Sequence, residues 1–260
     1  MKDQIVVVTG AGSGIGHATA LLAASRGARV AACDVDEARL ATLASELGDR
    51  AHVIRRVDVS DRAQVAAFAD AIDAVDVLVN NAGVGLGGAF VETSLDDWDW
   101  VLGVNLRGVV HGCHYFAPKM IARGRGHIVN VSSIFGIYAA PSSSAYVATK
   151  FAVRGLSLSL RAELAPHGIG VTAICPGMIA TNIVADGRIA GGGERKQRAA
   201  KIFRDRGAPP EKVATAILDA ARTNPAVRTV GRDARVIASL ARVAPRTLER
   251  IGAKLQRRLG

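Results

Sequence analysis

Tyr146 and Lys150 form the pair of residues with the clearest capacity for chemistry in this sequence. Their spacing of four places both side chains on one face of a helix that we predict to run to about Leu164. An unperturbed phenol has a pKa of about 10, and a nearby ammonium stabilises the phenolate and lowers that pKa. The pair therefore predicts an acid/base that takes a proton from an alcohol or gives one to a ketone. Because this spacing is common on helices, the prediction depends on neighbouring polar residues.

Two further polar residues are candidates for the same site. Ser133 stands thirteen residues before Tyr146, at the carboxyl end of a predicted strand, where open α/β sheets place their ligands. Its hydroxyl can hold a substrate oxygen beside the tyrosine, and the adjacent Ser132 is the alternative. Asn105 lies inside a predicted helix although Asn is a poor helix former, which favours a functional role over a surface Asn without one.

A glycine-rich segment near the N-terminus predicts a dinucleotide site. The run Thr9–Gly16 follows an apolar strand and opens a helix, and its spacing is Gly-x-x-x-Gly-x-Gly. Glycines let the backbone approach a pyrophosphate, whose charge is balanced by free N–H groups at the start of the helix. The loop residues expected to contact the cofactor are Gly10, Ser13, Gly14, Ile15 and Gly16. A plain glycine-rich turn is the alternative.

Asp34 follows the second predicted strand, at the distance where an acidic residue meets the adenosine ribose. Its carboxylate would face the 2′-phosphate of NADP(H), and neither Ser13 nor Val35 supplies a cation to pair with that phosphate. The sequence therefore favours NAD(H) as the cofactor. The alternative role for Asp34 is to cap the helix that begins near Asp36.

Apolar runs alternate with helical patterns along the chain and predict the elements that carry these residues. The strand candidates are Gln4–Thr9, Ala28–Cys33, Ala51–Val57, Asp76–Val79, Gly126–Val131, Gly168–Cys175 and Val227–Val230. Strands rich in Val and Ile with little polar alternation are buried on both faces, and the connections are long enough for helices. We predict a single-domain α/β fold with a doubly wound, seven-stranded parallel sheet.

The bulk composition excludes several classes of protein. With 260 residues, 49% of them hydrophobic and 4% aromatic, the chain is predicted to be ordered around an aliphatic core. Cys33, Cys113 and Cys175 lack metal-ligand spacing and are predicted to be buried thiols in a reducing compartment, and no metal site is expected. Neither a membrane-spanning run nor a signal peptide is evident, so a cytoplasmic location is expected.

Most of the formal net charge of +10 comes from the C-terminus. Residues 226–260 contain nine Lys or Arg and two acidic residues, so the body of the chain lacks the basic face that nucleic-acid binding needs. We divide the chain into a catalytic domain, 1–231, and a basic extension, 232–260, with amphipathic helices on either side of Pro245. The extension either lies on an anionic membrane, making the protein peripheral, or packs over its own pocket or a partner subunit.

The order and spacing of these motifs resemble the short-chain dehydrogenase/reductase family over about residues 4–230. The residues that carry the resemblance are Gly10, Gly14, Gly16, Asp34, the run Asn80–Gly83, Asn105, Ser133, Tyr146 and Lys150. The family implies a Rossmann fold and exchange of a hydride between NAD(H) and a secondary alcohol or ketone. It also implies a homodimer or homotetramer built on helices near 98–123 and 145–165, and a water anchored by Asn105 that connects Lys150 to solvent.

The resemblance implies further cofactor contacts. Asp58 and Val59 would flank the adenine, and Thr181, in a Pro-Gly-x-x-x-Thr segment, would hold the nicotinamide carboxamide. The residues assigned to the cofactor outside the glycine loop are Asp34, Asp58, Val59, Asn81, Ala82, Gly83, Tyr146, Lys150, Pro176, Gly177, Ile179 and Thr181. The chain departs from the family in a short third helix, expected to end near residues 71–74, and in the extension after Val230.

Apolar residues dominate the segments that should wall the substrate pocket, 84–90, 134–144 and 178–207. The residues expected near the nicotinamide are Leu86, Phe90, Ile134, Phe135, Tyr138, Met178 and Ile183. The first two segments contain no Arg or Lys, so a hydrophobic lipid-, steroid- or acyl-like alcohol or ketone is expected. A catalytically idle NAD(H) sensor and a membrane-surface scaffold are the alternative functions, and the complete Asn-Ser-Tyr-Lys set argues against the sensor.

Overall fold

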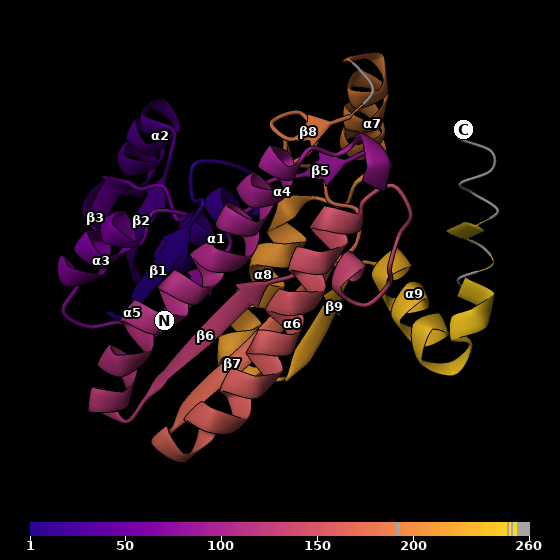
Figure 1. Cartoon of the computed structure of the whole chain (residues 1–260). Helices are drawn as coiled ribbons and strands as arrows, with labels where there is room; N and C mark the ends of the chain where they lie inside the picture. The colour runs from indigo at the N-terminus through magenta and orange to yellow at the C-terminus, as the bar shows by residue number, and fades with distance from the viewer. Residues whose placement is uncertain (191–192, 249, 251, 254–260) are drawn as a thin grey trace.

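The structure is a computed structural model that describes residues 1–190, 193–248, 250 and 252–253. A seven-stranded parallel sheet runs through its centre in the order β3-β2-β1-β4-β6-β7-β9 (Figure 1). The strands are β1 Ile5–Thr9, β2 Arg29–Asp34, β3 Ala51–Arg56, β4 Val77–Asn80, β6 Gly126–Val131, β7 Ile169–Pro176 and β9 Val227–Val230. Each lies within one residue of its predicted bounds at both ends, so the predicted doubly wound fold is confirmed.

Helices cover both faces of the sheet (Figure 1). One layer consists of α1 Gly14–Ser25, α2 Glu37–Leu47 and α8 Pro210–Thr223, and the other of α3 Arg62–Asp70, α5 Gly108–Arg123 and α6 Ser144–Leu164. Along β1, Val6 and Val8 pack against the first layer and Val7 against the second, and all three are fully buried. Covering both faces explains why the strands read as continuous apolar runs.

Shorter elements connect the strands and helices of the sheet, and α9 begins the segment after Gly231. They are the 3₁₀ turns η1 Gly48–Arg50, η2 Phe90–Glu92, η4 Ile134–Gly136 and η5 Ala165–His167, the π-helical turn η3 Gly103–Arg107, the strands β5 Leu86–Gly87 and β8 Arg188–Ile189, and the helices α4 Leu95–Leu102, α7 Gly193–Arg206 and α9 Arg232–Val243. β5 and β8 form a separate two-stranded ladder that links the segment after β4 to the segment after β7. The sequence did not predict it, because strands of two residues carry no periodic signal.

The third helix is short, as expected, and ends at Asp70. Asp61 caps its start by accepting hydrogen bonds from the backbone N–H groups of Ala63 and Gln64, at 2.8 and 3.3 Å. The three cysteines are free and buried, which confirms their interpretation as core residues. No helix among the described residues is long and apolar enough to cross a membrane.

The chain leaves β1 toward one edge of the sheet, through β2 and β3, and β4 begins the path toward the other edge. Strand order therefore reverses between β1 and β4, and open α/β sheets bind ligands outside the carboxyl ends of the strands at such a point. The glycine loop follows β1 and the Asn-Asn-Ala-Gly run follows β4. The fold thus brings these two motifs to one crevice.

The extension begins with α9, which matches the first predicted amphipathic helix. After Ala244 the chain is again helical at residues 245–248, 250 and 252–253. Leu248 is buried, and a Cβ added to Gly252 would meet the Tyr138 hydroxyl. The predicted apolar positions Ile251, Leu255 and Leu259 lie outside the described residues.

Candidate active site

α6 carries Tyr146 and Lys150 on one face, as their spacing predicted. Lys150 is 3% exposed and its Nζ lies 5.5 Å from the centre of the Tyr146 ring. The same Nζ donates a hydrogen bond to the carbonyl of Val131 at 3.1 Å, at the end of β6. The two side chains therefore occupy one site where α6 crosses the carboxyl edge of the sheet.

Burial sets the protonation states of this pair. It raises the pKa of Tyr146 to about 12, and a hydrogen bond with Ser133 opposes part of this effect. Burial also lowers the pKa of Lys150 to about 8. The sequence predicted the opposite direction for Tyr146, and this expectation was wrong because the loss of hydration outweighs an ammonium that is directed at a backbone carbonyl. At neutral pH, Tyr146 is therefore a protonated donor and Lys150 keeps its charge.

The two adjacent serines have different surroundings. Ser132 is buried and donates its hydroxyl hydrogen to the carbonyl of Lys150 at 2.8 Å, so it links β6 to α6. Ser133 is the N-cap of η4, where its hydroxyl accepts a hydrogen bond from the N–H of Phe135 at 3.1 Å and also hydrogen-bonds with Tyr146. Of the two candidates, Ser133 is the one beside the phenol.

Asn105 is fully buried within the π-helical turn η3, between α4 and α5. Its amide exchanges two hydrogen bonds with the backbone of Val84, accepting from N–H at 2.8 Å and donating to the carbonyl at 3.0 Å. It also donates to the hydroxyl of Thr149 on α6, at 3.4 Å. A Cβ added to Gly83 would lie 3.3 Å from Asn105 Oδ1 and 3.5 Å from Lys150 Nζ, so both residues flank Gly83. π-Helical turns occur frequently at functional sites.

The glycine loop is tied to the run after β4. Thr9, which the sequence analysis did not assign to the site, accepts hydrogen bonds at its hydroxyl from the N–H groups of Asn81 and Ala82, both at 3.0 Å. The Asn81 side chain donates to the carbonyls of Thr9 and Gly10, both at 3.0 Å. A Cβ on Gly16 would overlap the Gly10 carbonyl. Glycine at position 16 is therefore required by close approach of the backbone.

The loop has the donors that a pyrophosphate needs. Ser13 is the N-cap of α1 but makes no capping hydrogen bond to any described residue, so the first N–H groups of the helix keep no side-chain partner there. Thr181 lies across the loop, with its Cγ2 3.0 Å from the place a Cβ on Gly14 would occupy. These residues fit a bound dinucleotide, with Ile15 next to the loop glycines.

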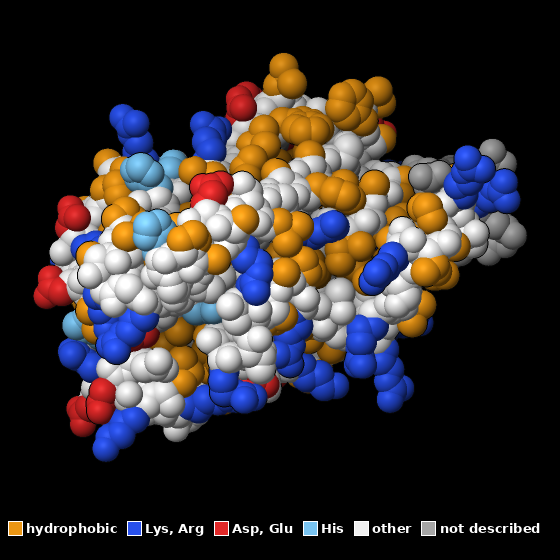
Figure 2. Space-filling view, turned by 90° about the horizontal axis from the view of Figure 1, so that it is seen from below, with side chains coloured by type: hydrophobic (Ala, Val, Ile, Leu, Met, Phe, Trp, Pro, Cys, Tyr) orange, Lys and Arg blue, Asp and Glu red, His pale blue; other side chains and the backbone are white. Residues whose placement is uncertain are grey.

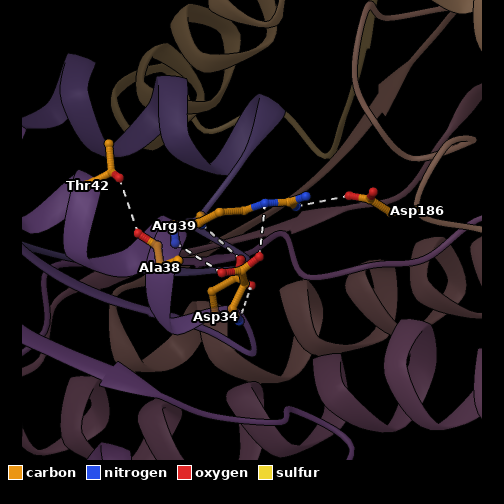
Figure 3. Close-up of polar contacts among 7 residues, drawn as sticks. Asp34, Ala38, Arg39, Thr42 and Asp186 are labelled. Atoms are coloured by element: carbon orange, nitrogen blue, oxygen red, sulfur yellow. Dashed lines mark hydrogen bonds and ion pairs between the residues drawn. The ribbon is translucent and has the colours of Figure 1, made fainter.

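Asp34 ends β2 beside this loop (Figure 3). One carboxylate oxygen accepts from the N–H of Gly12 at 2.8 Å and the other from the N–H of Asp36 at 3.1 Å. The cap of α2 is Asp36, which accepts from the N–H of Arg39 at 3.0 Å. The alternative reading of Asp34 as the cap of this helix is therefore wrong.

Figure 3 also shows a cation that the sequence analysis missed. Arg39, on α2, reaches across to Asp186 in the segment after β7, with 2.9 Å between Nη1 and Oδ2. Its Nε lies 3.2 Å from Asp36 Oδ2, and the nearby carboxylates, that of Asp186 first, raise the pKa of Arg39. Inspection of residues 13 and 35 alone missed Arg39, which the first turn of α2 brings beside Gly12 together with Asp34.

The other residues predicted to contact the cofactor lie after β3 and at the end of β7. Asp58 directs its carboxylate to the N–H and hydroxyl of Ser60, at 2.9 and 2.7 Å, and Val59 is buried against Gly108. Pro176 ends β7, and the N–H of Gly177 donates to the carbonyl of Val230 at 2.9 Å.

The apolar residues predicted to wall the substrate pocket differ in their exposure. The Phe135 ring meets the Tyr146 ring edge-on, with 6.1 Å between centroids, and Leu86 and Ile134 are each 6% exposed. Phe90 is 67% exposed and packs edge-on against Trp98 in the turn that precedes α4. Its assignment to the pocket wall stays a prediction.

Comparisons with known proteins agree with the geometry. Residues 4–189 match the family model for short chain dehydrogenases. The probable oxidoreductase EphD of Mycobacterium tuberculosis is 43% identical over 95% of this chain and 44% of its own length, so the chain spans less than half of that relative. The putative oxidoreductase SadH of the same species is 39% identical over 97% of this chain and 95% of its own length.

Two solved structures with similar folds contain bound dinucleotides. A short-chain dehydrogenase/reductase from Burkholderia phymatum in complex with NAD has a TM-score of 0.86 and 34% identity over 95% of both chains. A serine dehydrogenase complexed with NADP+ has a TM-score of 0.80 and 30% identity over 87% of this chain and 94% of its own. The match over most of the sequence and the shared architecture together show that the chain belongs to the short-chain dehydrogenase family.

Proposed function

We propose that this protein is an NAD(H)-dependent oxidoreductase that interconverts a secondary alcohol and a ketone, with Tyr146 as the acid/base. The observation that carries the proposal is the convergence of Tyr146, Ser133 and Lys150 beside a loop suited to a dinucleotide. Its test is an assay of a panel of ketones with NADH and of alcohols with NAD+. Turnover of at least one pair supports an enzyme, and cofactor binding without turnover of any pair supports the idle sensor.

Each polar side chain has a role in this proposal. Ser133 holds the substrate oxygen and Tyr146, protonated at neutral pH, donates the proton to it during ketone reduction. Lys150 stabilises the phenolate that remains, and Asn105 holds the backbone beside Lys150 and anchors a water that returns the proton. The nicotinamide of NADH would supply the hydride, held by Thr181 and the Pro176–Thr181 segment.

NAD(H) is proposed over NADP(H) because the carboxylate of Asp34 lies against the loop residue Gly12. Arg39 is the nearby cation, but it is paired with Asp36 and Asp186. We expect kcat/KM for NADH to exceed that for NADPH by about 100-fold, or ~2.7 kcal/mol, from one carboxylate–phosphate encounter. Asp34→Asn should reduce this ratio to roughly 10, since the 2′-phosphate of NADPH then no longer faces the Asp34 carboxylate.

The control for this cofactor measurement is Asp49→Asn, which neutralises an exposed carboxylate in η1 and should leave the ratio unchanged. Equal use of NADH and NADPH by the unsubstituted protein would show that Asp34 does not select the cofactor. An unchanged ratio in Asp34→Asn would exclude its carboxylate as the cause of any preference.

A hydrophobic substrate is proposed because the side chains near Tyr146 are apolar, with Phe135 in edge-on contact. A homodimer or homotetramer is proposed on α5 and α6, each of which exposes large apolar side chains. These are Val110 and Ile121 on α5 and Phe151 and Leu158 on α6. Burying such residues between subunits is favourable.

The C-terminal extension is proposed to bind anionic membrane surfaces. Val236 and Val243 on α9 are 58% and 77% exposed, and Figure 2 shows Lys and Arg side chains gathered where the extension projects. We expect the protein to co-sediment with anionic vesicles at low salt, because each Lys or Arg near such a surface contributes about 1 kcal/mol. Zwitterionic vesicles, high salt and the double substitution Val236→Asp with Val243→Asp should each abolish binding.

Absence of binding to anionic vesicles at low salt would eliminate the membrane role. The buried Leu248 and the contact between Gly252 and Tyr138 would then define the extension as a cover for its own domain.

A further inference from the structure

α9 places a carboxylate against the backbone that leads to Thr181. The N–H of Met178 donates a hydrogen bond to Asp233 Oδ2 at 2.8 Å. A Cβ added to Gly177 or to Gly231 would overlap the same carboxylate, so Asp233 fills the space between the two glycines. Asp233 is the second residue of α9, and the extension therefore contacts the Pro-Gly segment from its first turn.

The carbonyl of Met178 is bound by a different part of the chain, the segment before α8. The N–H of Ala208, before α8, donates to the carbonyl of Met178 at 2.9 Å, and the N–H of Ala180 donates to the carbonyl of Ala208 at 2.9 Å. Ile179 and Ala208 form a parallel bridge. The backbone of Met178 is thus fixed through both its N–H and its carbonyl. The hydrogen bond of the N–H depends on the Asp233 side chain, which a substitution can remove.

The fixed backbone continues directly to the glycine loop. The N–H of Thr181 donates to the carbonyl of Ile179 at 2.9 Å, which folds the chain back after Met178. The Thr181 side chain then lies against Gly14. A shift of Met178 would therefore move Thr181 relative to the loop.

We propose that Asp233 is a positioning residue that sets the nicotinamide end of the cofactor site, acting through the N–H of Met178. The inference rests on the proposed function, in which Thr181 holds the carboxamide of the nicotinamide. A carboxylate suits this role because hydrogen bonds to charged acceptors are shorter and stronger than neutral ones. The basic extension is then part of the cofactor site and not an independent appendage.

A purely structural role for Asp233 makes a different prediction. A negative charge in the first turn of a helix interacts favourably with the helix dipole, so Asp233 also stabilises α9. Losing only that interaction would lower the melting temperature. It would not weaken binding of the nicotinamide more than binding of the adenosine and pyrophosphate. A ligand that lacks the nicotinamide distinguishes the two roles.

The test compares NADH with ADP-ribose, which has the adenosine and pyrophosphate but no nicotinamide. In the full chain, Asp233→Ala is expected to raise the Kd of NADH about tenfold, equivalent to ~1.4 kcal/mol, and to change the Kd of ADP-ribose less than about twofold. Asp233→Asn keeps a carbonyl oxygen as acceptor and should restore most of the NADH affinity. Arg232→Ala, which removes an exposed charge from the same helical turn, is the matched control and should change neither Kd.

Equal weakening of both ligands, or no weakening of NADH, by Asp233→Ala would overturn the proposal. Thermal unfolding of each variant shows whether it is folded. If Asp233→Ala does not fold, Asp233→Glu provides the same comparison, because it keeps the charge but displaces the carboxylate from Met178. Failure of the unsubstituted protein to bind either ligand would instead overturn the proposed function, and the role of Asp233 with it.

Discussion

Replacing Tyr146 by Phe is expected to lower kcat for ketone reduction by about 1,000-fold, within the range that general acid–base catalysis contributes. The substitution removes the hydroxyl but keeps the ring, which packs edge-on against Phe135. The proton donor is lost while the loop that binds the dinucleotide is untouched. The Kd of NADH should therefore change less than about twofold.

Steady-state kinetics and fluorescence titration of NADH measure these two quantities on the same samples. Tyr115→Phe, which removes a phenolic hydroxyl from α5, is the matched control and should leave both unchanged. A loss of kcat limited to a few-fold in Tyr146→Phe would contradict the role of this tyrosine as the acid/base.

Replacing Lys150 by Ala is expected to lower kcat by about 100-fold or more, and to raise the Kd of NADH about tenfold. The ammonium is buried and lies close to both the Tyr146 ring and Gly83, so its removal affects the proton donor and the cofactor side of the site together. Lys150→Ala should therefore change both kcat and the Kd of NADH, whereas Tyr146→Phe should change kcat alone. Lys201→Ala, on the exposed surface of α7, is the control and should affect neither.

The lowered pKa of Lys150 gives the same prediction a pH dependence. Burial brings this pKa down to about 8, so the ammonium is present below that pH and is lost as the pH rises through it. Ketone reduction should therefore decline above about pH 8. Lys150→Ala should lose this limb of the pH profile, and a decline that persists in the variant would assign it to another group.

The fold was predictable because its strands are buried on both faces. Val6, Val7 and Val8 read as one apolar run for the same reason that the structure places helices on each side of β1. The glycine spacing and the separation between Ser133 and Tyr146 were also local enough to read from sequence. The glycines lie between the end of β1 and the start of α1, and the spacing of Ser133 and Tyr146 matches that of the family.

The parts of the site that escaped prediction depend on tertiary contacts. Arg39 and Asp186 form an ion pair although they are far apart in sequence. Asp233 reaches Met178 from α9, near the other end of the chain (Figure 1). The pKa of Tyr146 follows from burial, which a spacing of four residues does not reveal. The exposure of Phe90, 67%, is likewise set by the tertiary placement of η2 and has no signal in the local sequence.

Isotope transfer tests the central claim most directly. NADH that carries deuterium at both C4 positions of the nicotinamide is incubated with the full chain and a ketone from the panel that supports turnover. The proposed function predicts one deuterium on the carbinol carbon of the alcohol product, and almost no labelled product from Tyr146→Phe in the same time. An alcohol product without deuterium on its carbinol carbon, or deuterium that appears in water instead, would contradict hydride exchange at this site.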